Sequence, residues 1–311
     1  QAFVDTMRET FASLGMTEEL SFSFTSTAAL DKLCVPEDSM LRHAVPIMNP
    51  LMEEYPLVRT TLLTSILENA ARNVARRNLD LRLFDIAPVF FPRALPVTEL
   101  VEEKRKVAGL LTGRRNPIAW DTDNAMVDFY DAKGVLERFL SAIGVQKYTV
   151  ERGEHFAMHP GKTAFFKKGR DVIAVLGEIH PTVAANFGIG QSVYVFEMDA
   201  ETLLRYRKKK TAIKPLPKYP ASTRDLAILV DAGLTTAEIE RVIAKKGGKF
   251  FRGATLFDVY MGKQVGSGKK SMAFHLHFQS DDKTLTDEEV DAAFADILAA
   301  AQSQLHAELR A

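Results

Sequence analysis

The stretch that decides the fold of the last part of this chain is "LFDVYMGKQVGSGKKSMAFHLHF", residues 256–278. Apolar and polar residues alternate before and after the glycines Gly266 and Gly268, and an alternation of period two is typical of a β-strand. Clustered glycines between two such runs are a turn signal. The stretch therefore predicts two neighbouring strands that are joined by a basic, glycine-rich turn.

The turn also comes close to a phosphate-binding loop, which requires the pattern G-x-x-x-x-G-K-[ST]. Here Lys263 stands in place of the first glycine, and Lys270 stands where a hydroxyl that binds Mg²⁺ is needed. Such a loop must also begin a helix, whose N-terminus faces the phosphate. The residues after Lys270 alternate like a strand instead, so we prefer the strand–turn–strand interpretation.

The segments around this pair of strands complete a recognisable order. Periodicity predicts strands over 224–231, 254–260 and 271–279, helices over 235–246 and 286–306, and a short last strand over 307–310. Thr235 or Thr236 can cap the first helix, and Thr286 with Glu289 has the pattern of a capping box for the second. The order β-α-β-β-α-β is the ferredoxin-like split motif.

The two faces of this predicted sheet differ in chemistry, because successive side chains of a strand point to opposite sides. The face expected to pack on the helices carries apolar residues: Leu226, Ile228, Val230, Phe257, Val259, Met272, Phe274, Leu276 and Phe278. The outward face carries Asp225, Ala227, Leu229, Asp258, Tyr260, Ser271, Ala273, His275 and His277. An open face with an aromatic ring, a hydroxyl and imidazoles suits bases that stack and form hydrogen bonds, as in RNA recognition.

Basic residues gather near this face. Between residues 241 and 270 only Asp258 opposes the following cluster: Arg241, Lys245, Lys246, Lys249, Arg252, Lys263, Lys269 and Lys270. The segment 205–218, "RYRKKKTAIKPLPK", is also basic and contains two prolines, which helices exclude. It is either a solvated linker or a contact to nucleic-acid phosphates. His275 and His277 form H-x-H, but no cysteine or further histidine nearby completes a metal site, so we expect none.

The overall composition sets outer limits. The chain has 311 residues, about two domains by the usual size, and its 40 acidic residues balance its 40 basic ones. A single cysteine, Cys34, excludes an internal disulfide and a zinc site built from several cysteines. No apolar run approaches 18 residues and no signal peptide is recognisable, so we expect a cytoplasmic protein without a membrane partner. The start at Gln1 suggests a segment of a longer polypeptide.

The first two thirds of the chain read as an antiparallel α+β domain, since helices and strands do not alternate strictly. An opening helix ends at Gly15 and carries one apolar stripe, formed by Phe3, Val4, Met7, Phe11 and Leu14. Further helices are expected over 62–74, 128–143 and 182–187. Strands are expected over 20–24, 81–87, 107–111, 174–176 and 193–198.

Several segments together resemble the β-subunit of bacterial phenylalanyl-tRNA synthetase. They are "NPLMEEYPLVRTTLLTSILENAARNVARRNLDLRLFDIAPVF" (49–90), "DFYDAKGVLERFL" (128–140), "HPGKTA" (159–164), "VLGEIHPTVAANFGI" (175–189), "YPASTRDLAILVD" (219–231), the opening stretch and "TLTDEEVDAAF" (284–294). The resemblance implies a degenerate, inactive class II synthetase domain over 1–205, a basic linker over 206–217 and a ferredoxin-fold anticodon-binding domain over 218–311.

The resemblance also implies a non-catalytic role within phenylalanine–tRNA ligase. The α-subunit of the family carries aminoacylation, so ATP and Mg²⁺ are implied for the complete α2β2 enzyme and no cofactor for this segment. The sequence agrees. A class II site uses arginines to neutralise the triphosphate of ATP, and here no arginine directly follows the strand 81–87 or the "GIG" at 188–190. The stripe of Phe3, Met7, Phe11 and Leu14 would pack against the α-subunit, or else within its own domain.

The family motifs imply specific contacts to tRNA(Phe). Ala227 in "RDLA" would pack closely, Tyr260 in "LFDVY" would stack on a base, and Ser271 in "KKS" would bond a base edge. Arg224, Lys269 and His275, in or beside the same motifs, are expected to contact the tRNA as well. A free-standing RNA-binding or regulatory paralogue without a synthetase partner is the alternative, and an independent ATP-using enzyme is a third, disfavoured by the missing arginines.

Overall fold

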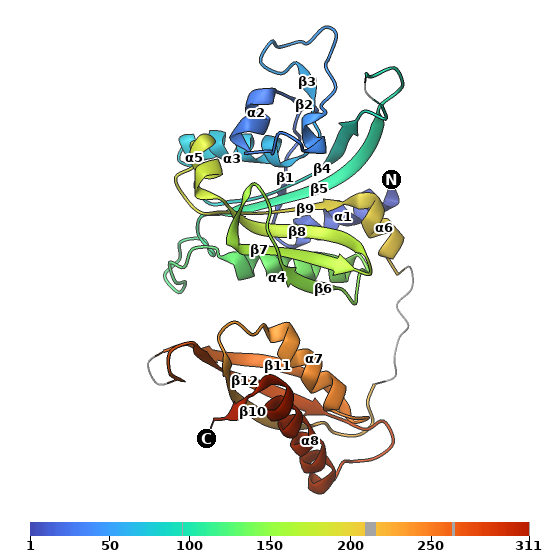
Figure 1. Ribbon diagram of the computed structural model, residues 1–311, viewed down its shortest axis with the longest axis vertical. Helices are drawn as coiled ribbons and strands as arrows, with labels where there is room; N and C mark the ends of the chain where they lie inside the picture. Colours follow the sequence, from blue (N-terminus) through green and yellow to red (C-terminus); the bar gives the residue numbers. More distant parts are fainter. Residues whose placement is uncertain (95, 209–215, 263–264, 311) are drawn as a thin grey trace. The chain divides into compact units, whose positions relative to one another are not determined.

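The computed structural model describes residues 1–94, 96–208, 216–262 and 265–310. The chain divides into two compact units, Gln1–Thr211 and Ala212–Ala311 (Figure 1). Within the expected basic linker, residues 209–215 fall outside the described part, as does Lys263 of the basic cluster. Each unit has its own sheet and its own hydrophobic core.

Unit 1 is built on a seven-stranded sheet in the order β1-β4-β5-β9-β8-β7-β6. The strands are β1 (Thr17–Glu18), β4 (Leu81–Phe91), β5 (Glu102–Thr112), β6 (Thr149–Arg152), β7 (Met158–Lys168), β8 (Asp171–Ile179) and β9 (Val193–Asp199). Only β1 runs parallel to its neighbour β4, and the other pairs are antiparallel. A separate antiparallel pair joins β2 (Phe24–Thr25) to β3 (Leu57–Val58). The predicted antiparallel α+β fold is confirmed.

Helices cover both faces of this sheet and close two cores (Figure 1). One core contains residues of α1 (Ala2–Ser13), α4 (Phe129–Ala142) and α6 (Ala200–Tyr206). The other contains residues of α2 (Thr27–Lys32), α3 (Leu63–Ala75) and α5 (Pro181–Asn186), and a short 3-10 helix, η1 (Met40–Arg42), follows α2.

Local sequence signals explain two of these helix ends. Asp128 accepts hydrogen bonds from the backbone N–H groups of Tyr130 and Asp131, and the Asp131 carboxylate accepts one from the backbone N–H of Asp128, so α4 begins with a capping box. Gly15 follows α1 with φ of +78°, a left-handed conformation that glycine adopts without strain. The predicted start of α4 and end of α1 are thereby confirmed.

Some expectations for unit 1 were wrong. The alternating segment 20–24 forms a strand only at its end. The apolar side chains of Leu20 and Phe22 point to solvent. Glu19 forms a hydrogen bond with Asn69, and Ser21 forms one with Asp85. The strands β6 and most of β7 and the helix α6 were not expected. The segment "HPG" at 159–161 lies inside β7, where the pairing with β8 shifts register between Met158 and Thr163.

Unit 2 has the predicted ferredoxin-like order. Its elements are β10 (Ser222–Asp231), α7 (Thr236–Lys246), β11 (Phe251–Tyr260), β12 (Lys269–Phe278), α8 (Asp287–Leu305) and β13 (Glu308–Leu309). The sheet is antiparallel in the order β11-β12-β10-β13. Both helices begin with capping boxes: Thr286 was expected to form one, and Thr235 was one of the two residues expected to cap α7. Ile239 of α7 and Ile297 of α8 share one core with Leu226 and Phe274, so both helices cover the same face of the sheet.

A β-bulge in β11 overturns part of the predicted side-chain alternation. Leu256 lies opposite Phe274 but Asp258 already lies opposite Ala273, so Phe257 is an extra residue in the strand. The Phe257 side chain therefore faces outward and is 50% exposed, although we expected it in the core. Val259 is also exposed, at 48%, because β11 is the edge strand of the sheet.

Candidate nucleic-acid interface

The open face of the unit 2 sheet brings the three main predicted contact residues together. Tyr260 of β11 lies directly opposite Ser271 of β12. On the other side of β12, Ala227 of β10 lies opposite Ala273. Because Ser271 and Ala273 are two residues apart, their side chains share a face. Ala227, Tyr260 and Ser271 thus come from three adjacent strands and lie on one surface, as the sequence predicted.

A second aromatic group lies on the same surface. The ring of Phe257 stacks on the imidazole of His275, with 3.9 Å between the centroids and 13° between the planes. The Nδ1 atom of His275 lies 2.6 Å from Asp225 Oδ1, which fixes the ring from the neighbouring strand. His275 is therefore on the predicted face. Phe257 adds a stacking group there, which the sequence did not predict because it did not reveal the bulge.

Arg310 is the residue of this surface that we did not expect. Its Nη1 donates a 2.9 Å hydrogen bond to Ser271 Oγ, and its guanidinium carbon lies 5.5 Å from the centre of the Tyr260 ring. Its backbone N–H donates a 3.0 Å bond to the carbonyl of Ala227. Ser271 is only 2% exposed in spite of its place on the open face, and the Arg310 guanidinium is bonded to its hydroxyl.

The predicted cationic contacts behave differently from one another. Lys269, at the start of β12, forms an ion pair with Glu308 of β13. Arg224 lies on the helix side of the sheet, where it forms 2.8 Å ion pairs with Asp287 and Asp291 of α8. These two hydrogen-bonded carboxylates raise the pKa of the Arg224 guanidinium. Arg224 does not share the face of Tyr260, and its charge is already balanced within the protein.

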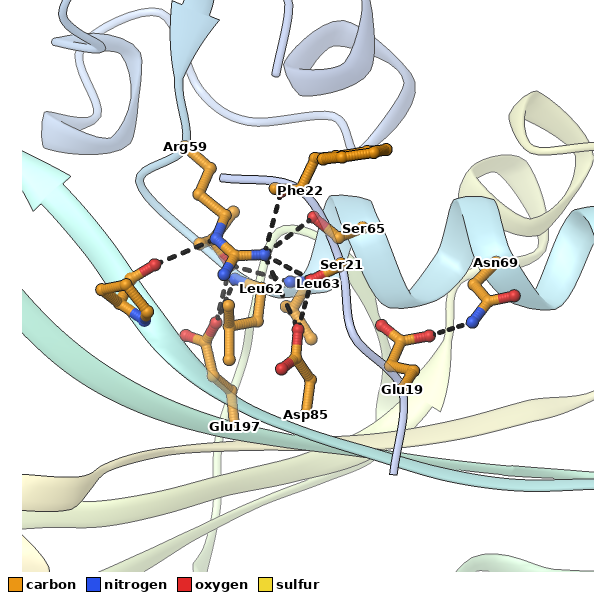
Figure 2. A network of polar contacts seen from close by, with 12 residues as sticks. Glu19, Ser21, Phe22, Arg59, Leu62, Leu63, Ser65, Asn69, Asp85 and Glu197 are labelled. Atoms are coloured by element: carbon orange, nitrogen blue, oxygen red, sulfur yellow. Dashed lines mark hydrogen bonds and ion pairs between the residues drawn. The ribbon is translucent and has the colours of Figure 1, made fainter. Parts of the chain in front are cut away.

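Unit 1 contains a buried polar network on the α3 side of its sheet (Figure 2). Arg59 is completely buried and donates to the carbonyls of Pro88 and Phe22 at 3.0 and 3.2 Å. Its guanidinium also bonds Ser21 Oγ and lies 3.6 Å from Asp85 Oδ2. Burial lowers the pKa of Arg59 and raises that of Asp85. Within the described residues, Arg59 Nη2 has no hydrogen-bond partner.

Glu19 lies in the same region, and its carboxyl group has a strongly raised pKa. Its Oε2 accepts a hydrogen bond from Asn69 of α3, while its Oε1 is buried and has no partner in the described chain (Figure 2). Burial raises the pKa of the Glu19 carboxyl to about 7, and the nearby Asp85 carboxylate adds to the effect. Glu19 is therefore a structural acid that holds its proton more tightly than an exposed glutamate.

The apolar stripe of α1 is not the exposed partner surface that we considered. Met7 and Phe11 are fully buried, and Phe11 stacks on Phe139 with 4.0 Å between the ring centroids. Phe3 and Leu14 are partly buried against the same core. The other interpretation, an intramolecular core stripe, is correct for Met7 and Phe11, because α1 packs on α4 and the sheet of its own unit.

The described residues contain neither a cluster of metal ligands nor a membrane-spanning helix. No group of three or more histidine, cysteine or acidic side chains could hold a metal ion. No helix in that part of the chain is long and apolar enough to cross a membrane.

Comparisons with known proteins agree with this arrangement. Residues 1–200 match the model of the "Phenylalanyl tRNA synthetase beta chain CLM domain", and residues 217–310 match the "Ferredoxin-fold anticodon binding domain". The phenylalanine–tRNA ligase beta subunit of Syntrophotalea carbinolica is 39% identical over 99% of this chain. That of Clostridium acetobutylicum is 38% identical over 100% of it. The chain spans 38% of the length of each of these relatives.

A solved structure shows the same fold at lower similarity. Pyrrolysyl-tRNA synthetase from Desulfitobacterium hafniense matches 65% of this chain and 67% of its own length, with a TM-score of 0.50 and 14% identity. This likeness shows the fold alone, and with unit 2 it defines the class of chains that combine a class II synthetase-like fold with a ferredoxin-fold anticodon-binding domain. Within that class, the chain belongs to the phenylalanyl-tRNA synthetase β-chain family.

Proposed function

We propose that this chain is a non-catalytic part of phenylalanine–tRNA ligase that binds the anticodon region of tRNA(Phe). The observation that carries the proposal is the open face of unit 2, where Tyr260, Phe257 and His275 provide rings for stacking and the Ser271 hydroxyl lies beside Tyr260, bonded to Arg310. Unpaired anticodon bases are recognised by such stacking and by hydrogen bonds to their edges. We propose residues 218–311 as the anticodon-binding domain, 1–205 as the catalytic-like domain and 206–217 as the linker.

The geometry of unit 1 favours a structural role over a catalytic one. Arg59 is buried against Asp85, Ser21 and two backbone carbonyls, so its charge is committed within the protein. A class II site needs accessible arginines to neutralise the triphosphate of ATP. We therefore assign ATP and Mg²⁺ to the complete ligase, with catalysis on the α-subunit, and place the assembly in the cytoplasm with the other translation enzymes.

The α-subunit needs a surface other than the α1 stripe. The side chains of Leu20 and Phe22 are 91% and 73% exposed on the segment that leads into β2. Met48 and Leu51 are exposed on the loop between Pro46 and Leu57. The two ends of this loop, Pro46 and Leu57 of β3, form an isolated antiparallel bridge. Large apolar side chains that are exposed together on a surface mark interaction sites. We propose that these segments contact the α-subunit in the α2β2 assembly.

The test is co-expression of the full β-subunit with a catalytic α-subunit, followed by purification through a tag on α and an assay of tRNA(Phe) aminoacylation. The proposal expects the two chains to purify together and to aminoacylate tRNA(Phe), with no activity from either alone. A β-chain that binds RNA but never purifies with α would support the free-standing RNA-binding paralogue instead.

A further inference from the structure

Arg310 lies across the surface that we assign to the anticodon, and it differs from Arg224 and Arg252 of the same unit, which are paired with carboxylates. Arg224 has two carboxylate partners on α8, and Arg252 has Asp281 at 3.2 Å. Among the described residues no carboxylate forms an ion pair with Arg310. A guanidinium carries five N–H donors, and the hydrogen bond to Ser271 Oγ uses one of them. Arg310 therefore retains donors that a ligand can use.

The backbone holds this side chain in place over the three strands. Leu309 of β13 pairs with Ile228 of β10, and the Arg310 N–H bonds the carbonyl of Ala227. From that anchor the side chain passes β10 and reaches Ser271 of β12 and Tyr260 of β11. A base that stacks on Tyr260 or bonds Ser271 must meet the Arg310 guanidinium first.

We propose that Arg310 is a base-contacting residue of the tRNA-binding face, which stacks its guanidinium plane on the base that Tyr260 holds and releases Ser271 as that base enters. This inference rests on the proposed function and adds a residue and a role to it. The planar guanidinium stacks on aromatic faces, including the bases of single-stranded RNA. The guanidinium already lies over the Tyr260 ring, where a base stacked on that ring would contact it.

The planar shape distinguishes this role from a simple phosphate contact. A phosphate is bound by any nearby cation, and lysine serves as a point charge for that purpose. A stacked base needs the flat guanidinium, which lysine lacks. Arg310→Lys keeps the charge and loses the plane, so it separates the two roles.

The experiment uses the complete ligase and measures affinity at one fixed salt concentration for tRNA(Phe) and for the same tRNA with its anticodon replaced. The enzymes are the wild type, Tyr260→Ala, Arg310→Ala, Arg310→Lys and the control Arg138→Ala, which removes an exposed arginine from α4 in unit 1. Thermal melting of each enzyme reports whether folding is preserved. We expect Arg310→Ala to weaken binding of tRNA(Phe) by about tenfold, with little change for the replaced anticodon.

We also expect Arg310→Lys to bind as weakly as Arg310→Ala, and Arg138→Ala to bind like the wild type. If Arg310→Lys restores full affinity, the residue is a point charge for phosphate and the stacking role is wrong. If Tyr260→Ala weakens binding while Arg310→Ala does not, the inference fails and the proposed function stands. If the wild type does not distinguish the two tRNAs, the proposed function itself fails, and the inference with it.

Discussion

The ring of Phe257 stacks on the imidazole of His275 at 3.9 Å, on the face of the unit 2 sheet that the helices leave open. The bulge at residues 256–258 produces this contact, since a regular strand would turn Phe257 into the core. The surface therefore carries two aromatic groups from one strand, Phe257 and Tyr260. Two such groups can stack two bases of the anticodon.

Phe257→Ala tests this second stacking group. Because half of the side chain is exposed, we expect the free energy of unfolding to change by about 1 kcal/mol or less. Loss of one stacked base should weaken tRNA(Phe) binding by roughly tenfold. The measurements are thermal melting and the tRNA dissociation constant at fixed salt.

Phe274→Ala is the matched control, because Phe274 of β12 is fully buried against α7 and α8. A buried phenylalanine costs about 3–5 kcal/mol on truncation, so this variant should melt much earlier than Phe257→Ala. Equal melting of the two variants would contradict the outward assignment of Phe257.

Glu19 makes the stability of unit 1 depend on pH. Its pKa is raised from 4.5 to about 7, so the folded protein binds this proton more tightly than the unfolded chain. The stabilisation is complete below pH 4.5 and is lost as the pH rises through about 7. With about 1.4 kcal/mol for each pKa unit, the loss amounts to roughly 3 kcal/mol.

Glu19→Gln removes this titration and supplies an amide oxygen that can still accept the hydrogen bond from Asn69. We expect the variant to lose less stability than the wild type between pH 4.5 and 7, as measured by denaturant unfolding at several pH values. Parallel pH profiles for the two proteins would show that Glu19 titrates normally and that its burial is not maintained in solution.

Leu20 and Phe22 test the partner surface. The double variant Leu20→Ser/Phe22→Ser should weaken association with the α-subunit by about a hundredfold or more, because each apolar side chain contributes about 1.5–3 kcal/mol when fully buried and ~1.4 kcal/mol is a factor of ten. Melting of the β-chain alone should change little, since both side chains face solvent. Leu100→Ser, at another exposed leucine, is the control and should leave association unchanged. Unaltered association of the double variant would place the α-subunit elsewhere.

The sequence predicted most of unit 2, because its signals are local. Thr235 and Thr286 cap the helices as expected, and the alternation from Ser271 to Phe278 gives β12 its two faces. The bulge at Phe257 was not predictable in this way. A single extra residue reverses the alternation without changing the apolar character of the strand, and only the pairing with β12 reveals it.

Two other features depend on contacts between distant segments. Arg310 reaches Ser271 and Tyr260 only because β13 pairs with β10, and the short strand expected over 307–310 did not reveal which side chains its last residue would contact. In unit 1 the alternation of residues 20–24 was recognised, but the polar side chain of Ser21 points inward there and the apolar side chains of Leu20 and Phe22 are exposed. Arg59 and Asp85, which lie far along the chain, make that orientation favourable by supplying ionic and hydrogen-bond partners.

The central claim is that the open face of unit 2 binds the anticodon, and the most direct measurement is the affinity of Tyr260→Ala for tRNA(Phe). Base stacking on an aromatic ring contributes about 1–3 kcal/mol, so we expect binding to weaken by roughly ten- to a hundredfold at fixed salt, with melting nearly unchanged. A Tyr260→Ala protein that melts like the wild type and binds tRNA(Phe) with undiminished affinity would contradict the claim.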